Sequence, residues 1–166
     1  MFYGVTRQTQ ALEMARDVCQ RLTPNNACEA YALLAGTMCA ETGLTTTRDT
    51  YEAQGRGVVQ FDEIRFNDVR KYITVARPEL RAKIKDLYGI DFAGIGFGLV
   101  LDFSPLVCLI ACRVGYMMIP EKLPPKDAIL QQAKYWKKHW NSSLGAGTPE
   151  HYIKAVQKHA NIISTR

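Results

Sequence analysis

The sequence has no apolar run long enough to cross a membrane. Its longest apolar region, residues 93–120, is broken by Asp102, Pro105 and Arg113, whereas a membrane helix needs about 20 consecutive apolar residues. We therefore expect this region to lie in the core. Residues 1–10 also lack the basic start and apolar stretch of a secretory signal peptide. We expect a protein that is made, and at first kept, in a cytoplasm.

Cysteine pairs of the Cys-x-x-Cys type are absent as well. The chain has five cysteines, an odd number, and all lie in apolar stretches with helical character: Cys19, Cys28, Cys39, Cys108 and Cys112. A reduced thiol in such a stretch behaves as a small hydrophobe. We expect reduced core cysteines, and only Cys19 and Cys28 are close enough in sequence to suggest a disulfide.

Signatures of several other chemistries are missing. The three histidines, His139, His151 and His159, show no metal-ligand spacing, and we expect no metal and no cofactor. We expect His151 and His159 on a solvated helix. No Gly-x-Ser-x-Gly sequence marks a serine hydrolase. The glycine series in residues 94–98 lacks the further glycine, strand and lysine of a nucleotide-binding loop, so close helix packing is the better interpretation.

The chain is long enough for one globular domain with a core. Its 166 residues are 47% hydrophobic and 22% charged, and we assign residues 1–166 to one domain, expected to be monomeric. The net charge of +5 favours anionic surfaces such as nucleic acid, lipopolysaccharide or a cell wall. Lys134, Lys137, Lys138 and His139 share one predicted helix. A solvated helical face is the simpler interpretation of this cluster, and a binding patch is the alternative.

Apolar residues at helical spacing predict a mainly α fold. The second predicted helix, residues 27–41, is apolar nearly all round, which indicates a central position, and Gly43 is placed to end it. The other predicted helices, the first of them capped by Thr6, cover residues 7–22, 63–76, 78–88, 104–118, 126–140 and 148–160. Residues 44–60 are rich in polar residues and glycine, and only residues 58–61 have the pattern of a strand. The prediction is a helical domain with a small strand-and-loop insert after the second helix.

Glu41 is the most informative residue of the chain. It ends the most apolar helical segment, residues 26–40, and is followed at once by Thr42 and Gly43. An ionised carboxylate at the end of a buried helix is costly, so we expect its proton affinity to rise, as in a general acid. From the residues alone, the alternative is a carboxylate that points to solvent.

Two motifs around this residue resemble a known family. The helix that ends in Glu-Thr-Gly at 41–43 and the Gly-Arg-Gly-Val-Val-Gln-Phe-Asp stretch at 55–62 resemble the lysozyme-like superfamily, in particular its goose-type lysozyme and lytic transglycosylase branch in bacteriophages. Residues 112–124 and 135–148 resemble the closing helices of phage cell-wall hydrolases. The resemblance spans residues 27–158. It implies an α+β lysozyme-like fold in which the insert lines a saccharide cleft and Glu41 is the catalytic acid.

A second carboxylate usually accompanies the acid of a glycosidase. The resemblance offers Asp62, which follows the glutamine-containing stretch. Asp62 also immediately precedes a predicted helix, where an N-cap role alone explains an aspartate, and the two roles are compatible. Asp49 and Glu52 in the loop are reserve candidates.

The resemblance also implies residues that contact the substrate. Gln60 would offer its amide to the sugar, because cleft walls need neutral donors and acceptors for acetamido and hydroxyl groups. Tyr116, Tyr135, Trp140 and Asn141 are further cleft candidates, and Trp140-Asn141 occupies the place of an aromatic–Asn pair that more often begins with tyrosine. Core packing is the alternative for each aromatic residue.

These expectations describe a phage-type, peptidoglycan-degrading glycosidase. It would cut the β-1,4 bond between N-acetylmuramic acid and N-acetylglucosamine. Asp62 favours hydrolysis with a second acid, and the alternative is a lytic transglycosylase reaction that needs Glu41 alone and gives 1,6-anhydro products. Its partner would be bacterial peptidoglycan, with no nucleic acid and no membrane span. It would act as an endolysin released from the host cytoplasm to the wall, or as a virion-associated entry enzyme. The competing class is a non-catalytic basic helical protein, either structural or nucleic-acid-binding.

Overall fold

The computed structural model describes residues 1–48, 55–142 and 145–164. In this part of the chain the protein is mainly helical, as predicted, and contains no strand. The reserve candidates Asp49 and Glu52 lie outside the described residues. The α-helices are α1 (Gln8–Leu22), α2 (Ala27–Thr42), α3 (Glu63–Lys71), α4 (Pro78–Tyr88), α5 (Leu99–Phe103), α6 (Pro105–Met117), α7 (Ile129–Trp136), α8 (Pro149–Lys158) and α9 (Ala160–Ile163). Short helical turns are η1 (Pro24–Asn26), η2 (Tyr72–Ala76), η3 (Phe92–Gly94) and η4 (Lys137–Asn141).

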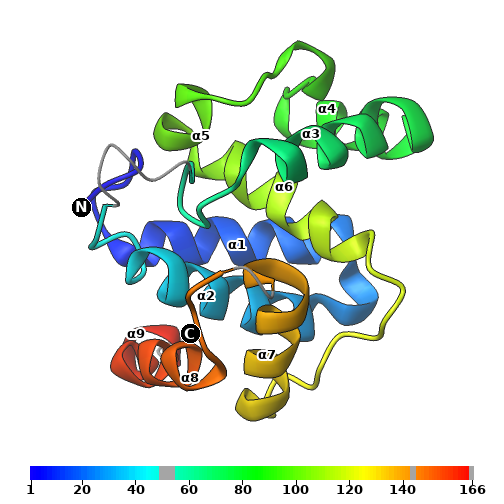
Figure 1. Ribbon diagram of the computed structural model, residues 1–166. Helices are drawn as coiled ribbons and strands as arrows, with labels where there is room; N and C mark the ends of the chain where they lie inside the picture. Colours follow the sequence, from blue (N-terminus) through cyan, green and yellow to red (C-terminus); the bar gives the residue numbers. More distant parts are fainter. Residues whose placement is uncertain (49–54, 143–144, 165–166) are drawn as a thin grey trace.

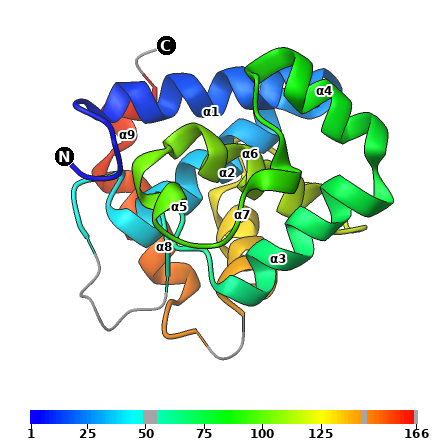
Figure 2. The same ribbon diagram turned by 90° about the horizontal axis from the view of Figure 1, so that it is seen from above.

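Helix α2 lies at the centre of the molecule. It contacts α1, α6, α7 and α8, and Figure 1 shows α3 to α6 above α1 and α2, with α7 to α9 below them. Leu33, Leu34 and Met38 of α2 are fully buried, so the central position predicted from its all-round apolar surface is confirmed. Seen from above, α3 and α8 lie on opposite sides of α7 (Figure 2).

Side-chain caps begin several helices, and the one at Asp62 was predicted from the sequence. Asp62 accepts a hydrogen bond from the backbone N–H three residues on, at 2.8 Å, and Ser104 and Thr148 cap α6 and α8 in the same way. The first helix differs from the prediction because Thr6 is not its cap. The side chain of Gln10 accepts hydrogen bonds from the backbone N–H groups of residues 6 and 7 instead, at 2.8 and 3.0 Å.

The predicted helix over residues 126–140 begins later, at Ile129, and ends in the π-helical turn η4. The buried side chain of Gln132 donates hydrogen bonds to the carbonyls of Pro125 and Lys126, at 2.9 and 2.7 Å. These bonds hold the preceding residues in a turn, so the helix starts after them. Helical spacing in the sequence did not reveal this because it does not register a side chain that caps carbonyls.

The strand predicted over residues 58–61 is a tight turn. Arg56 and Phe61 form an isolated bridge, in which each backbone N–H donates to the other carbonyl at 2.8 Å. Gly57 and Gln60 have φ angles of 73° and 50°, and two left-handed residues reverse a chain that a strand would extend. The two valines between them are fully buried, which explains why this segment has the composition of a strand.

The second part of the long apolar region lies in the core, whereas the first part contributes the buried Leu101 but also carries exposed side chains. Helix α6 is buried along most of its length, but Leu99 and Phe103 of α5 are 58% and 72% exposed. The glycines of residues 94–98 do not pack closely either, since a Cβ atom at any of them would meet no atom within 4 Å. No helix in the described part of the chain is both long and apolar enough to cross a membrane.

The cysteines are all reduced, and four of the five are buried. Cys28 is exposed, which corrects the expectation of a core position and leaves the suggested disulfide with Cys19 unformed. Burial raises the pKa of Cys19, Cys39 and Cys108 to about 12. These three thiols therefore stay protonated at neutral pH.

Candidate active site

Glu41 is the last residue but one of α2, and its side chain is half-buried. Gly43 adopts the left-handed conformation, with φ 54°, and ends the helix as predicted. The Oε1 atom of Glu41 accepts a hydrogen bond from Nε1 of Trp136 at 3.1 Å. Because an indole N–H can only donate, this bond orients the carboxyl group.

A hollow of about 380 Å³ opens beside this carboxyl group, and we call it the Glu41 hollow. It lies between the end of α2, the end of α7 and the start of α8. The residues that line it are Ala40, Glu41, Trp136, Asn141, Ala146, Gly147, Thr148 and His151. Among these described residues, Glu41 supplies the one carboxylate.

Trp136 is held firmly enough to orient its partner. It is 1% exposed, and its ring packs on Tyr152 with ring centroids 5.4 Å apart. Gly147 lies against the other edge of the indole, where a Cβ atom would come within 2.5 Å of Cη2. Nothing in the sequence distinguishes Trp136 from an ordinary core aromatic residue, because the contact with Glu41 joins two helices that are far apart in the chain.

His151 is exposed on α8, as the sequence predicted, and it also lines the Glu41 hollow. Its Nε2 atom lies 2.8 Å from the carbonyl oxygen of Ala40. A carbonyl can only accept, so the ring donates from Nε2. This bond joins Ala40, the residue before Glu41, to α8. His159, the other histidine predicted to be solvated, is buried, with its Nδ1 atom 3.3 Å from Nε2 of Gln8.

Three segments that the sequence analysis singled out, the end of α2, residues 55–62 and η4, meet at the turn of residues 57–60. The hydroxyl of Thr42, next to Glu41, donates to the carbonyl of Val58 at 2.9 Å. From the other side, Nε1 of Trp140 donates to the carbonyl of Val59 at 3.0 Å. The end of α2, the turn and η4 are therefore joined through two adjacent carbonyls.

Asp102 fixes the same turn from α5, and sequence reasoning missed it. Its Oδ1 atom accepts from the backbone N–H of Gly57 at 2.8 Å, and Oδ2 accepts from Arg56 at 2.9 Å. The side chain of Asp102 is buried. An aspartate within an apolar region indicates a buried carboxylate with hydrogen-bond partners. The sequence does not show that these partners belong to the turn of residues 57–60.

Gln60 does not offer its amide nitrogen to the Glu41 hollow. Nε2 donates to the hydroxyl of Tyr3 at 3.0 Å and to the carbonyl of Gly57 at 2.8 Å. Its Oε1 atom is buried and has no hydrogen-bond partner among the described residues. The structure thus uses this amide to brace the turn, in place of the substrate contact that we expected.

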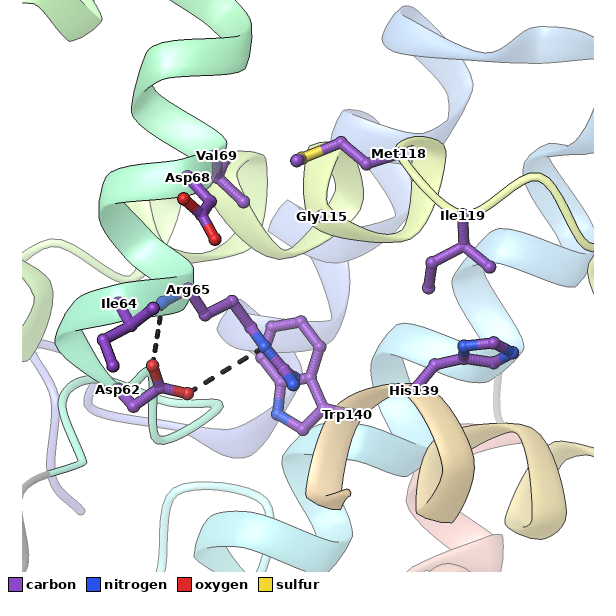
Figure 3. A pocket seen from close by; sticks show the side chains of 10 residues that line it. All are labelled: Asp62, Ile64, Arg65, Asp68, Val69, Gly115, Met118, Ile119, His139 and Trp140. Atoms are coloured by element: carbon purple, nitrogen blue, oxygen red, sulfur yellow. Dashed lines mark hydrogen bonds and ion pairs between the residues drawn. The ribbon is translucent and has the colours of Figure 1, made fainter. Parts of the chain in front are cut away.

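Asp62 lines a different hollow from Glu41. This second hollow, of about 510 Å³, lies between α3, the end of α6 and η4, and we call it the α3 hollow (Figure 3). The residues that line it are Asp62, Ile64, Arg65, Asp68, Val69, Gly115, Met118, Ile119, His139 and Trp140. Asp62 is the N-cap of α3, so the alternative role proposed for it from sequence is confirmed.

The remaining predicted cleft residues are divided among three places. Tyr116 is 2% exposed, and its hydroxyl lies 2.7 Å from that of Thr37, so it is a core residue and does not line a cleft. Tyr135 is also buried and donates to the carbonyl of Glu121 at 3.1 Å. Trp140 lines the α3 hollow and Asn141 lines the Glu41 hollow.

The described residues contain no group of three histidine, cysteine, aspartate or glutamate side chains arranged to hold a metal ion. Comparison of the chain with protein-family models, with curated proteins and with solved structures gives no match. The Glu41 hollow and the α3 hollow, with their side chains, are therefore the features that bear on function.

Proposed function

We propose that the protein is a peptidoglycan-degrading glycosidase with a lysozyme-like fold, in which Glu41 is the general acid. The bond cut would be the β-1,4 bond between N-acetylmuramic acid and N-acetylglucosamine. The net charge of +5 supports this substrate class, since a basic protein is attracted to a wall that carries acidic peptides.

The observation that carries the proposal is the position of Glu41 at an open hollow, with its carboxyl group oriented by a rigid donor. Trp136 holds Oε1 at 3.1 Å, and hydrogen bonds through Val58 and Val59 bring the two other motif segments to the same place. A general acid needs such fixed geometry at a site that a substrate can enter. The hollow of about 380 Å³ has the size of a small-ligand site.

In the proposed reaction, Glu41 donates its proton to the glycosidic oxygen. The bond from this oxygen to C1 of the muramic acid breaks, and the N-acetylglucosamine end leaves with a new hydroxyl group. Positive charge then develops at C1 and on the ring oxygen, and the Glu41 carboxylate stabilises it. A nucleophile must attack C1 to complete the reaction.

The placement of Asp62 favours the lytic transglycosylase route for this second step. An inverting hydrolase needs a second carboxyl group about 6.5 to 9.5 Å from the acid, across the bond that is cut. Among the described residues, the Glu41 hollow offers no second carboxylate, and Asp62 lines the α3 hollow. The 6-hydroxyl of the muramic acid can attack C1 itself and return its proton to Glu41, which gives the 1,6-anhydro product without a second acid.

Replacement of the acid tests the proposal. Glu41→Gln should lower the clearing of purified peptidoglycan by about a hundredfold or more, while Glu29→Gln, at the other end of α2, should leave it unchanged. Equal clearing by parent and Glu41→Gln, or none by either, would show that the proposal is wrong. Mass spectrometry of the digest separates the routes, because anhydro-muropeptides indicate a transglycosylase and reducing ends indicate a hydrolase. A parent that binds nucleic acid with steep salt dependence and leaves peptidoglycan intact would instead belong to the competing basic binding class.

A further inference from the structure

The α3 hollow has an apolar floor that matches a hydrocarbon chain. Val69, Ile119 and Trp140 contribute to it, and Gly115 leaves space at its base. A Cβ atom at Gly115 would lie 3.4 Å from Val69 and 3.5 Å from Trp140. An added Cβ atom would therefore be in ordinary van der Waals contact with the floor, and the glycine leaves that space open.

Three charged side chains lie over this floor: Arg65 and Asp68 on α3, and Asp62 at its N-cap. The Arg65 guanidinium lies over the Trp140 ring, 4.7 Å from its centroid, and 3.9 Å from Oδ2 of Asp62. Asp68 is exposed, and its carboxylate forms no hydrogen bond or ion pair with any residue that the structure describes. Residues three apart share a helix face, and Figure 3 shows both side chains on the Trp140 side of α3. A ligand with an amine, a carboxylate and a short apolar chain would match this arrangement.

Consecutive residues of η4 line the α3 hollow and the Glu41 hollow. Trp140 lines the first and Asn141 the second, and consecutive Cα atoms are about 3.8 Å apart. A sugar in the Glu41 hollow and a substituent in the α3 hollow would therefore both lie against η4.

We infer that the α3 hollow binds the stem peptide of peptidoglycan through its diamino acid. The side-chain amine would pair with Asp68, a carboxylate would pair with Arg65, and the methylene chain would lie on Val69 and Ile119. This inference rests on the proposed function, because the stem peptide hangs from the lactyl group of the muramic acid that Glu41 would act on. It adds recognition of the peptide to cleavage of the glycan.

Two substrates separate the peptide site from the glycan site. Asp68→Asn should lower the cleavage rate of peptide-bearing peptidoglycan about three- to tenfold, which corresponds to the typical net contribution of one hydrogen bond. It should leave unchanged the rate on glycan strands whose peptides an amidase has removed. Asp86→Asn on α4 removes the same charge outside the hollow and should match the parent on both substrates. Equal rates for Asp68→Asn and the parent on both substrates would overturn the inference, and so would an equal loss on both, which would assign the hollow to the glycan.

A binding measurement decides the inference even if no bond is cut. Calorimetry with the free tripeptide L-alanyl-γ-D-glutamyl-meso-diaminopimelate should show binding to the parent and to Asp86→Asn, and binding weakened by the same factor in Asp68→Asn. Absence of tripeptide binding to the parent would contradict the stem-peptide site. Absence of cleavage of either substrate by the parent, with tripeptide binding intact, would contradict the glycosidase alone.

Discussion

The hydrogen bond from Trp136 to Glu41 joins an indole to a carboxyl group whose ionisation it should sense. The contact measures 3.1 Å, and Trp136 is almost fully buried, so solvent contributes little to its environment. At the scale of residues, this hydrogen bond fixes the orientation of the carboxyl group that we propose as the general acid. The sequence singled out Glu41 because it ends an apolar helix, but it gave no sign of Trp136, because the two residues lie 95 positions apart in the chain.

This pair gives a spectroscopic prediction that does not depend on enzymatic activity. The chain has two tryptophans, so Trp140→Phe leaves Trp136 as the sole tryptophan, and its emission can be excited selectively over that of the tyrosines. Its emission should change with pH as Glu41 ionises, because a charge at hydrogen-bond distance acts on the excited indole. The same titration of Trp140→Phe/Glu41→Gln should lack that change. Identical pH profiles for the two proteins would contradict the contact.

Other side chains differ in whether their hydrogen-bond partners are near or distant in the sequence. The N-cap role of Asp62 could be predicted because it depends on the next three residues alone. The bracing role of Gln60 could not, because Tyr3 and the turn around Gly57 supply its partners. Local hydrogen bonds are encoded in short sequence windows, and long-range ones are not.

At the scale of elements, the packing of α2 on α8 depends on a glycine in the middle of α2. A Cβ atom at Gly36 would overlap the hydroxyl group of Tyr152, which is fully buried on α8. The helices therefore approach each other where α2 has no side chain. This contact supports the wall of the Glu41 hollow that α8 provides.

A pair of glycine substitutions tests this packing. Gly36→Ala should destabilise the protein by about 1 to 3 kcal/mol, because the added methyl group overpacks the α2–α8 contact. Gly115→Ala on α6 should be neutral or stabilising by up to about 1 kcal/mol, since its Cβ would have ordinary contacts at 3.4 Å or more and alanine favours a helix over glycine. Urea denaturation measures both effects. Equal changes in the two variants would mean that Gly36 has no special packing role.

The helices and the turn differ in how well the sequence predicted them. The bounds of α2 and α4 were close to the prediction because apolar spacing, proline and terminal glycine all act within a few residues. The turn of residues 57–60 was mistaken for a strand because buried valines are common to both. Its conformation is held by Asp102 from α5, which no local pattern of residues 55–62 contains.

At the scale of the whole molecule, the two ends of the chain pack together through His159. Its ring lies 3.3 Å from the side chain of Gln8 on α1, and α9 contacts α1. Burial, with a further contribution from Lys158, lowers the pKa of His159 below its ordinary value of 6.5. The structure thus buries a neutral imidazole where the sequence predicted a solvated one.

The consequence is a loss of stability in acid. Because the pKa is lower in the folded protein, the unfolded chain binds a proton in the interval below 6.5 that the folded protein does not. The contribution of neutral His159 is complete above that value and declines as the pH falls through the folded pKa. The free energy of unfolding should therefore decrease from about pH 7.5 to about pH 5. His159→Gln should show a smaller decrease over the same interval in urea titrations, and an equal decrease would contradict this assignment.

The sequence by itself determined a mainly helical protein, the central position of α2, several helix caps and the position of Glu41 at the end of α2. These features follow from spacing, capping and hydrophobicity, which act between residues that are close in the chain. Only the tertiary structure decided that Glu41 pairs with Trp136, that Asp62 lines a separate hollow, and that Tyr116 belongs to the core. Each of these depends on which helices pack together, and packing brings together side chains that no local pattern relates.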